Sequence, residues 1–132
     1  MKTQNEKIRH WIKISDEDLN VAETLLNNKH YLYAGFICHL AIEKIFKACY
    51  QKLKNQTPPF IHDLSRLAKL ADFYHLLSND QKLFVNTLTP LNIEARYPEY
   101  KEQVAKTLKK DICREIFEKT KILQKWTKET IL

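Results

Sequence analysis

Residues 39–47 read HLAIEKIFK, and this stretch decides the fold more than any other part of the sequence. It lies in a predicted helix over residues 31–54, where apolar side chains recur on almost every side. A helix of this kind normally occupies the centre of a protein. Charged side chains in such a place must be paired or functional. The stretch nevertheless carries Glu43, Lys44 and Lys47.

The charges on this helix form a column. His39, Glu43 and Lys47 follow one another at intervals of four residues. On an exposed helix the pair of Glu43 and Lys47 contributes only about 0.2–0.5 kcal/mol. In a central helix, however, a carboxylate is expensive to leave unpaired, so a cation must reach Glu43. The candidates for that cation are Lys44, Lys47 and Arg96.

Helical periodicity continues on both sides of the central helix. Ser15 precedes three acidic residues, which predicts a helix that starts there and ends at residues 27–28. Pro58 and Pro59 mark the clearest break in the chain. Three further helices are expected after this break: one near His62–Leu77, one capped by Ser78-Asn79-Asp80, and one over Lys101–Thr130.

The composition favours helices over strands. The chain has 132 residues but only one glycine and four prolines, which argues for long helices joined by short loops. We therefore expect an all-α antiparallel up-and-down bundle of four to five helices in a single domain over residues 1–132. The last helix carries a long apolar stripe that reaches Trp126. Either the other helices cover this stripe, or part of it meets a second copy of the chain.

Charge and cysteine content limit the environment and the partners. The formal net charge of +6 is compatible with nucleic acid, nucleotide phosphates or an acidic partner, and equally with a solvated mixed-charge surface. No apolar stretch approaches the ~20 residues of a membrane span, and the N-terminus lacks the apolar region of a signal peptide. Three cysteines without metal-binding spacing are expected to be buried and reduced. These features predict a cytoplasmic protein that binds no membrane.

The order of motifs resembles the HEPN family of small helical domains. The resemblance runs from about Ile14 to Lys125. It rests on three motifs: a central pattern formed by Ala34, Phe36, His39, Ala41, Glu43, Lys44 and Lys47, then His62-Asp63-Leu64, then Arg96-Tyr97-Pro98. It implies a helical bundle that is usually a homodimer. It also implies a minimal nucleotidyltransferase as partner, often within a toxin–antitoxin pair.

Many HEPN domains are metal-independent ribonucleases with an arginine followed four to six residues later by a histidine. Arg96 stands in the expected place, but no histidine follows it at that distance. The resemblance is therefore to the branch that lacks the ribonuclease motif, and we expect a binding module rather than an enzyme. Two alternatives stay open: a ribonuclease toxin that uses a distant histidine such as His39 or His62, and a scaffold that binds only protein.

The predicted ligand is a nucleotide or an RNA phosphate. No catalytic residue, cofactor or metal is expected. The candidate ligand-binding residues are Arg96, Lys44, Lys47, Glu43, Tyr97 and His39. Arg96 has a structural alternative, an ion pair with Glu43, and Tyr97 has the alternative of packing at the turn. Asp63 is expected to cap the following helix rather than to act in acid–base chemistry.

Overall fold

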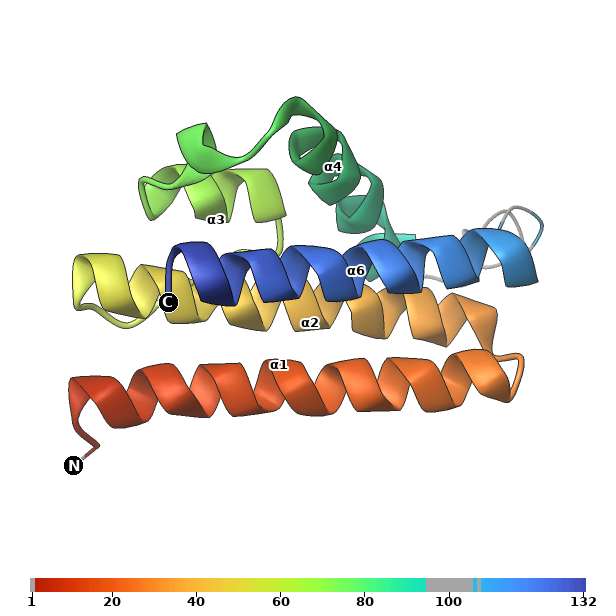
Figure 1. The fold of residues 1–132 in the computed structure, drawn as a ribbon, viewed down its shortest axis with the longest axis horizontal. Coiled ribbons are helices and arrows are strands. Elements are labelled where there is room, and N and C mark those ends of the chain that lie inside the picture. Colours follow the sequence, from red (N-terminus) through yellow and green to blue (C-terminus); the bar gives the residue numbers. More distant parts are fainter. Residues whose placement is uncertain (1, 95–105, 107) are drawn as a thin grey trace.

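The computed structural model of the chain describes residues 2–94, 106 and 108–132. These residues form five α-helices and one 3-10 turn, with no strand among them (Figure 1). The elements are α1 (Gln4–Asn27), α2 (Tyr31–Lys54), α3 (Leu64–Leu70), η1 (Tyr74–Leu76), α4 (Asn79–Glu94) and α6 (Lys110–Thr130). The predicted all-α bundle is confirmed.

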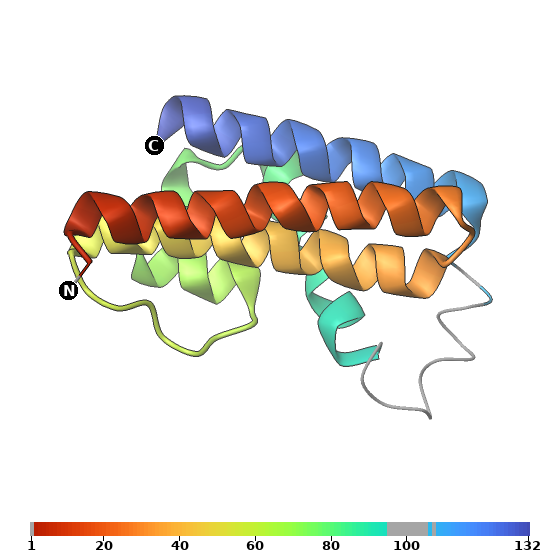
Figure 2. The same ribbon diagram turned by 90° about the horizontal axis from the view of Figure 1, so that it is seen from below.

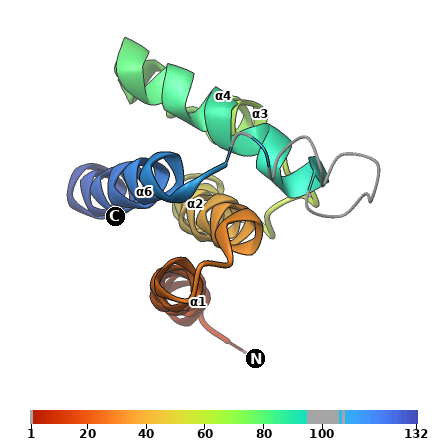
Figure 3. The same cartoon turned by 90° about the vertical axis from the view of Figure 1, so that its right-hand side faces the viewer.

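The three longest helices run in two directions (Figures 1 and 2). α1 runs antiparallel to α2, and the chain then returns through α3, η1 and α4 before α6 runs beside α2 in the same direction (Figures 1 and 2). The contacts agree, because Gln51 near the end of α2 donates to Gln4 at the start of α1, while Lys52 near the end of α2 donates to the carbonyl of Ile131 beyond the end of α6. Seen along the bundle, α4 crosses the other helices obliquely (Figure 3). The topology is the predicted up-and-down bundle.

The central helix is α2, which packs against α1, α3, α4 and α6. Its bounds confirm the prediction from the sequence. It ends where Asn55 adopts a left-handed conformation with φ of 51°, and the N–H of Asn55 donates to the carbonyl of Gln51. A left-handed residue after the last turn is a common helix end, and asparagine tolerates it well. This helix therefore brings its charged column into the middle of the protein.

Gly35 allows close packing near the start of α2. A Cβ atom at this position would lie 2.9 Å from Cδ2 of Leu108 and 3.2 Å from Cδ1 of Leu91. The absence of a side chain therefore lets α2 pack closely against Leu91 of α4 and against Leu108, which precedes α6. The chain has no other glycine.

The expected helix start at Ser15 is wrong. α1 begins at Gln4, and the hydroxyl of Thr3 caps it by accepting from the N–H of Glu6 at 3.1 Å. Ser15 lies in the middle of α1, fully buried, and its hydroxyl donates to the carbonyl of Ala41 at 2.6 Å. A serine next to acids resembles a cap in sequence, but here its hydroxyl joins two helices.

The expected third helix is shorter than predicted. α3 starts at Leu64, capped by Asp63, and ends before Asp72, which has a positive φ of 64°. That left-handed residue stops the helix, and only the short turn η1 follows. The predicted cap at Ser78 is confirmed, since its hydroxyl accepts from the N–H of Gln81 at 3.1 Å while the Gln81 side chain accepts from the N–H of Ser78 at 2.8 Å.

The expected last helix over residues 101–130 is wrong at its start. α6 begins at Lys110, and Lys109 before it is extended with ψ of 174°. Leu108 is buried beside Gly35 instead of continuing a helix. Residues 101–105 and 107 lie outside the described part of the chain. Packing of Leu108 into the core therefore outweighs the helical pattern of the sequence.

The structure also tests the predictions about the cysteines and about membrane-spanning helices. Cys38, Cys49 and Cys113 are buried and free, as predicted. Burial raises the pKa of the Cys38 thiol to about 12 and that of Cys113 to about 11. Within the described residues, no helix is both long and apolar enough to cross a membrane.

Candidate functional site

Glu43 on α2 is the centre of a group of charged and polar side chains. Nδ1 of His62 donates to its Oε1 at 2.7 Å, and Nζ of Lys47 donates to its Oε2 at 3.2 Å. Nζ of Lys44 lies 3.5 Å from Oε2, and Nδ1 of His39 lies 4.0 Å from Oε1. We call these five residues the charged cluster. The expectation that Lys44 or Lys47 reaches Glu43 is confirmed for both.

The carboxyl of Glu43 is held in its charged form. It is fully buried, and burial alone raises the pKa of a carboxyl group. The hydrogen bond from His62 and the charges of Lys47, His39 and Lys44 outweigh this effect and lower the pKa of Glu43 below its ordinary value. The buried carboxylate is therefore an anchor for the cations around it rather than a proton donor.

The charged cluster reaches solvent through two of its members. The side chain of His62 is 45% exposed and that of Lys44 is 22% exposed. Lys47, His39 and Glu43 are buried. A ligand in solution would therefore meet Lys44 and His62 first, and both of these side chains contact the buried Glu43.

His62 also fixes the loop that follows α2. Nε2 of His39 donates to the carbonyl oxygen of His62 at 2.8 Å. One residue later, the carboxylate of Asp63 accepts from the N–H of Arg66 at 3.2 Å and caps α3, as predicted. The loop over residues 55–63 is thus tied to α2 through both the side chain and the backbone of its His62.

Helix α1 contributes an aromatic ring and an acid beside the cluster. The ammonium groups of Lys44 and Lys47 each lie 5.7 Å from the centre of the Trp11 ring, a cation–π distance. Burial raises the pKa of Asp18 to about 6, although the charge of Lys44 lowers it in part. Oδ2 of Asp18 is buried and accepts no hydrogen bond from any described residue.

A second polar contact fixes α1 against α6. Nε2 of Gln124 donates to Oγ of Ser15 at 3.0 Å and to Oδ1 of Asp16 at 2.9 Å. Lys128 also donates to Oδ1 of Asp16, at 2.5 Å. Because Ser15 bonds Ala41 as well, three helices meet at one hydroxyl. These bonds set the position of Trp11 and Asp18 relative to α2.

The structure brings together four of the six residues predicted for ligand binding: His39, Glu43, Lys44 and Lys47. Arg96 and Tyr97 lie outside the described residues. The sequence did not predict that His62, Trp11 and Asp18 lie beside these residues. The His-Asp-Leu motif was the available signal for His62, whereas nothing in the local pattern linked α1 to this site.

The side chains of the cluster do not form a metal site. Among the described residues, no group of three or more His, Cys, Asp or Glu side chains is arranged to hold a metal ion. Lys44 and Lys47 are cationic and donate hydrogen bonds, so they oppose a bound cation. The chemistry of the cluster favours an anion.

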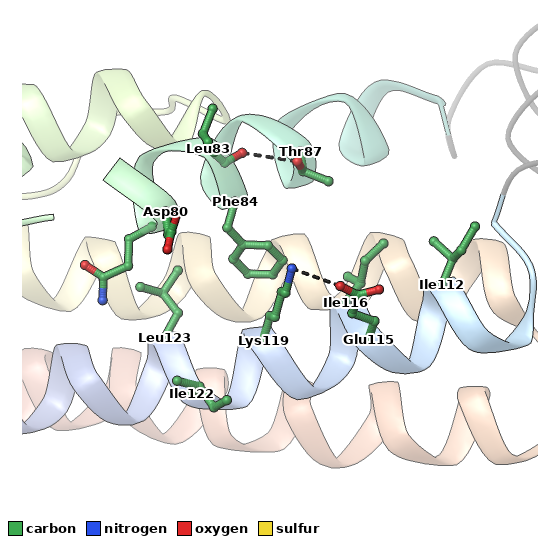
Figure 4. Close-up of a pocket in the computed structure, with 11 residues that line it drawn as sticks. Asp80, Leu83, Phe84, Thr87, Ile112, Glu115, Ile116, Lys119, Ile122 and Leu123 are labelled. Atoms are coloured by element: carbon green, nitrogen blue, oxygen red, sulfur yellow. Dashed lines mark hydrogen bonds and ion pairs between the residues drawn. The ribbon is translucent and has the colours of Figure 1, made fainter. Parts of the chain in front are cut away.

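A separate apolar groove of about 600 Å³ lies between α4 and α6 (Figure 4). The most exposed apolar side chains in it are Leu83 at 66% and Ile122 at 67%. Phe84 points from α4 toward α6, next to an ion pair of 3.0 Å between Lys119 and Glu115. Both helices pack on α2, which leaves this groove between them.

The chain is similar to a known protein family. The family model of the HEPN domain matches residues 8–130 of the chain. The match includes the whole charged cluster, Trp11, Asp18 and both walls of the groove. No curated protein and no solved structure matches the chain significantly.

Proposed function

We propose a phosphate-binding function for this chain, which belongs to the HEPN domain family. Domains of this family often take part in RNA binding or nuclease toxin activity. For this chain the proposed ligand is a nucleotide or an RNA phosphate. The proposed site is the exposed side of the charged cluster, formed by Lys44 and His62.

One observation carries this proposal: a single buried carboxylate orients two exposed hydrogen-bond donors. Both Lys44 and His62 contact Glu43, so neither group needs to be ordered when a ligand arrives. Donors that are already in place lower the entropic cost of binding. An ammonium and an imidazolium at the same carboxylate offer a phosphate charge-assisted hydrogen bonds from two sides. Because Nδ1–H of His62 is used by Glu43, the bond to phosphate comes from Nε2–H of the protonated ring.

The buried members of the cluster have supporting roles in this proposal. Lys47 neutralises Glu43 from within, and His39 holds the backbone of His62. Asp18 opposes anion binding, because its carboxylate lies near Lys44 and weakens the positive potential there. We retain Arg96 and Tyr97 as proposed phosphate and base contacts on the grounds of sequence alone.

The direct test is titration of fluorescein-labelled single-stranded RNA and of ATP with the purified protein. We expect the protein to bind these ligands more weakly as the salt concentration rises, because phosphate contacts release counterions. If Arg96 holds a phosphate, Arg96→Ala is expected to bind RNA and ATP more weakly than the wild-type protein does at the same salt concentration. Absence of saturable binding at low salt would refute the phosphate-binding function.

A second candidate function, a ribonuclease, is favoured by the contact between His62 and Glu43. A carboxylate that orients an exposed imidazole is the arrangement of a general base. His62 would take the proton of a ribose 2′-OH, whose oxygen would attack the adjacent phosphorus and release the 5′-oxygen. The leaving 5′-oxygen would take up a proton from solvent water, and the product would end in a 2′,3′-cyclic phosphate. His39 is fully buried and fits this role less well than His62.

RNA cleavage assays separate the two candidates. A nuclease is expected to produce cyclic-phosphate ends, and His62→Ala should abolish cleavage while leaving the protein folded. If the wild-type protein binds RNA without cutting it, binding is the function. If cleavage persists in His62→Ala, the activity does not come from this histidine.

The groove between α4 and α6 supports a homodimer as the proposed assembly. HEPN domains commonly dimerise. The groove exposes Leu83 and Ile122, and its edge carries both signs of charge, from Asp80 and Lys119. In a two-fold interface the same surface faces itself, so a basic residue of one copy can meet an acidic residue of the other. We therefore propose a second copy as the occupant of this groove.

Sedimentation velocity tests the dimer. Ile122→Glu places a charge in the groove and is expected to shift the protein from dimer to monomer. Val21→Glu is the matched control, since Val21 is an exposed apolar residue on α1 outside the groove. A monomeric wild-type protein, or a dimer unchanged by Ile122→Glu, would contradict the proposed interface.

A minimal nucleotidyltransferase in a toxin–antitoxin pair remains the proposed protein partner, and the cytoplasm the proposed location. The family resemblance supports the partner, and three buried free cysteines fit a reducing compartment. Co-expression with a nucleotidyltransferase encoded beside the gene is expected to yield a complex. If the chain binds such a protein but neither nucleotide nor RNA, it is a scaffold.

A further inference from the structure

Phe60 stands out because its side chain is 98% exposed. It lies in the loop over residues 55–63, between α2 and α3, which Figure 2 shows as an extended connection. Single exposed apolar residues are common on protein surfaces. A phenylalanine with almost its whole ring in water, two residues from the exposed histidine of a charged cluster, is much less ordinary.

The loop holds Phe60 in a defined position. Pro58 is buried, and the N–H of Ile61 donates to the carbonyl of Pro59 at 2.9 Å. This bond closes a three-residue turn with Phe60 at its centre. On the other side His62 is fixed to α2 through Glu43 and His39. The ring is therefore presented to solvent by a backbone that is anchored on both sides.

Phe60 lies two residues from His62 along the chain, which is within the reach of one nucleotide. Two residues of chain span at most about 7 Å, so the backbone of Phe60 stays close to that of His62. Sequence-tolerant binding of single-stranded nucleic acid combines cationic groups on the phosphates with aromatic rings that stack on unpaired bases. Lys44 and His62 supply the first component, and Phe60 is placed to supply the second.

We propose that Phe60 stacks on an unpaired base of single-stranded RNA whose phosphate contacts Lys44 and His62. This inference rests on the proposed phosphate-binding function and names the class of its ligand. The neighbouring donors favour a nucleic acid over a protein partner, because every nucleotide places a phosphate beside a base, which matches a cationic group beside an aromatic ring.

The test compares two ligands with the same charge. One is a labelled ten-nucleotide single-stranded adenosine RNA, and the other is an abasic oligomer of equal length. Affinities are measured by fluorescence anisotropy for the wild-type protein, Phe60→Ala, Phe60→Trp and Val21→Ala. The last variant is the matched control, since Val21 is an exposed apolar residue of α1 outside both the charged cluster and the groove.

Phe60→Ala is expected to weaken RNA binding roughly 5- to 150-fold, the range measured when one stacked base loses its aromatic partner. Phe60→Trp should retain or improve binding, and Val21→Ala should leave it unchanged. The wild-type protein should bind the abasic oligomer about as weakly as Phe60→Ala binds RNA. A 2-aminopurine base in the RNA should lose fluorescence with the wild-type protein and not with Phe60→Ala.

The outcomes separate this inference from the function on which it rests. If the wild-type protein binds RNA and the abasic oligomer equally, and Phe60→Ala has no effect, stacking is wrong and phosphate binding stands. If neither oligomer binds, both the stacking role of Phe60 and the phosphate-binding function are wrong. If Phe60→Ala leaves RNA binding intact but breaks a complex with a co-expressed protein, Phe60 is a protein contact and the inference is overturned. Melting temperatures of all variants should agree with that of the wild type.

Discussion

Nδ1 of His62 lies 2.7 Å from Oε1 of Glu43, which joins a half-exposed loop residue to a fully buried carboxylate. The contact bridges the central helix and the loop before α3. The same carboxylate also contacts Lys44 and Lys47. Glu43 is therefore both a structural centre and the anchor of the proposed site, and its removal should affect stability and binding together.

Glu43→Ala is expected to destabilise the protein by about 3–5 kcal/mol, because it leaves the buried Lys47 without its counter-charge. The free energy of unfolding in urea measures the effect. Glu23→Ala, which removes an exposed glutamate of α1, is the control and should change stability by less than about 0.5 kcal/mol. Equal stabilities of the two variants would contradict the pairing role of Glu43.

The lowered pKa of Glu43 predicts a dependence of stability on acid. A carboxyl group with a lowered pKa stabilises the fold above its unfolded pKa of about 4.3, and this contribution disappears as the pH falls through the folded value. The groups that face Glu43 are His39, Lys44, Lys47 and His62. Urea unfolding should therefore show a stability difference between wild type and Glu43→Gln that is full at pH 6 and shrinks below about pH 4. A difference independent of pH would count against this.

Asp18 predicts a pH dependence of stability opposite in sign to that of Glu43. Its pKa is raised to about 6 by burial, so the folded state holds a proton that the unfolded chain has already lost between about pH 4 and pH 6. Asp18→Asn should therefore stabilise the protein at pH 7.5 and lose this advantage in acid. It should also tighten RNA binding at pH 7.5, since a negative charge near Lys44 is removed. Glu17→Gln, which removes a neighbouring exposed charge, should produce neither effect to the same extent.

Ser15→Ala tests the junction of α1, α2 and α6. The substitution removes the hydrogen bonds of Oγ with Ala41 and Gln124 inside the core. Thermal or urea unfolding should reveal a loss of about 1–3 kcal/mol. Thr24→Ala is the control, because its hydroxyl makes only an exposed bond within α1. If both variants unfold alike, the junction does not stabilise the bundle.

The sequence predicted the fold well where local patterns decide it. The bounds of α2 followed from its apolar periodicity, and the caps Asp63 and Ser78 followed from local hydrogen-bonding chemistry. Ser15 misled because a hydroxyl before acids has the same local signature as a cap. Leu108 misled because its burial against Gly35 is a tertiary contact that helical spacing does not contain.

The candidate site was predictable only in part for the same reason. Glu43 and its lysines belong to one helix, so their spacing in the sequence sets their distances. His62 follows Glu43 by nineteen residues and reaches it from the loop after α2. Trp11 and Asp18 approach the charged cluster from another helix, α1. Such contacts depend on how helices pack.

The most direct measurement of the central claim is the affinity of Lys44→Gln for single-stranded RNA, compared with Lys125→Gln. Both variants lose one positive charge, but Lys125 lies on α6, outside the charged cluster. We predict that Lys44→Gln binds at least about tenfold more weakly than Lys125→Gln, the cost of one charged hydrogen bond. Equal affinities of the two variants would contradict a phosphate site at the charged cluster.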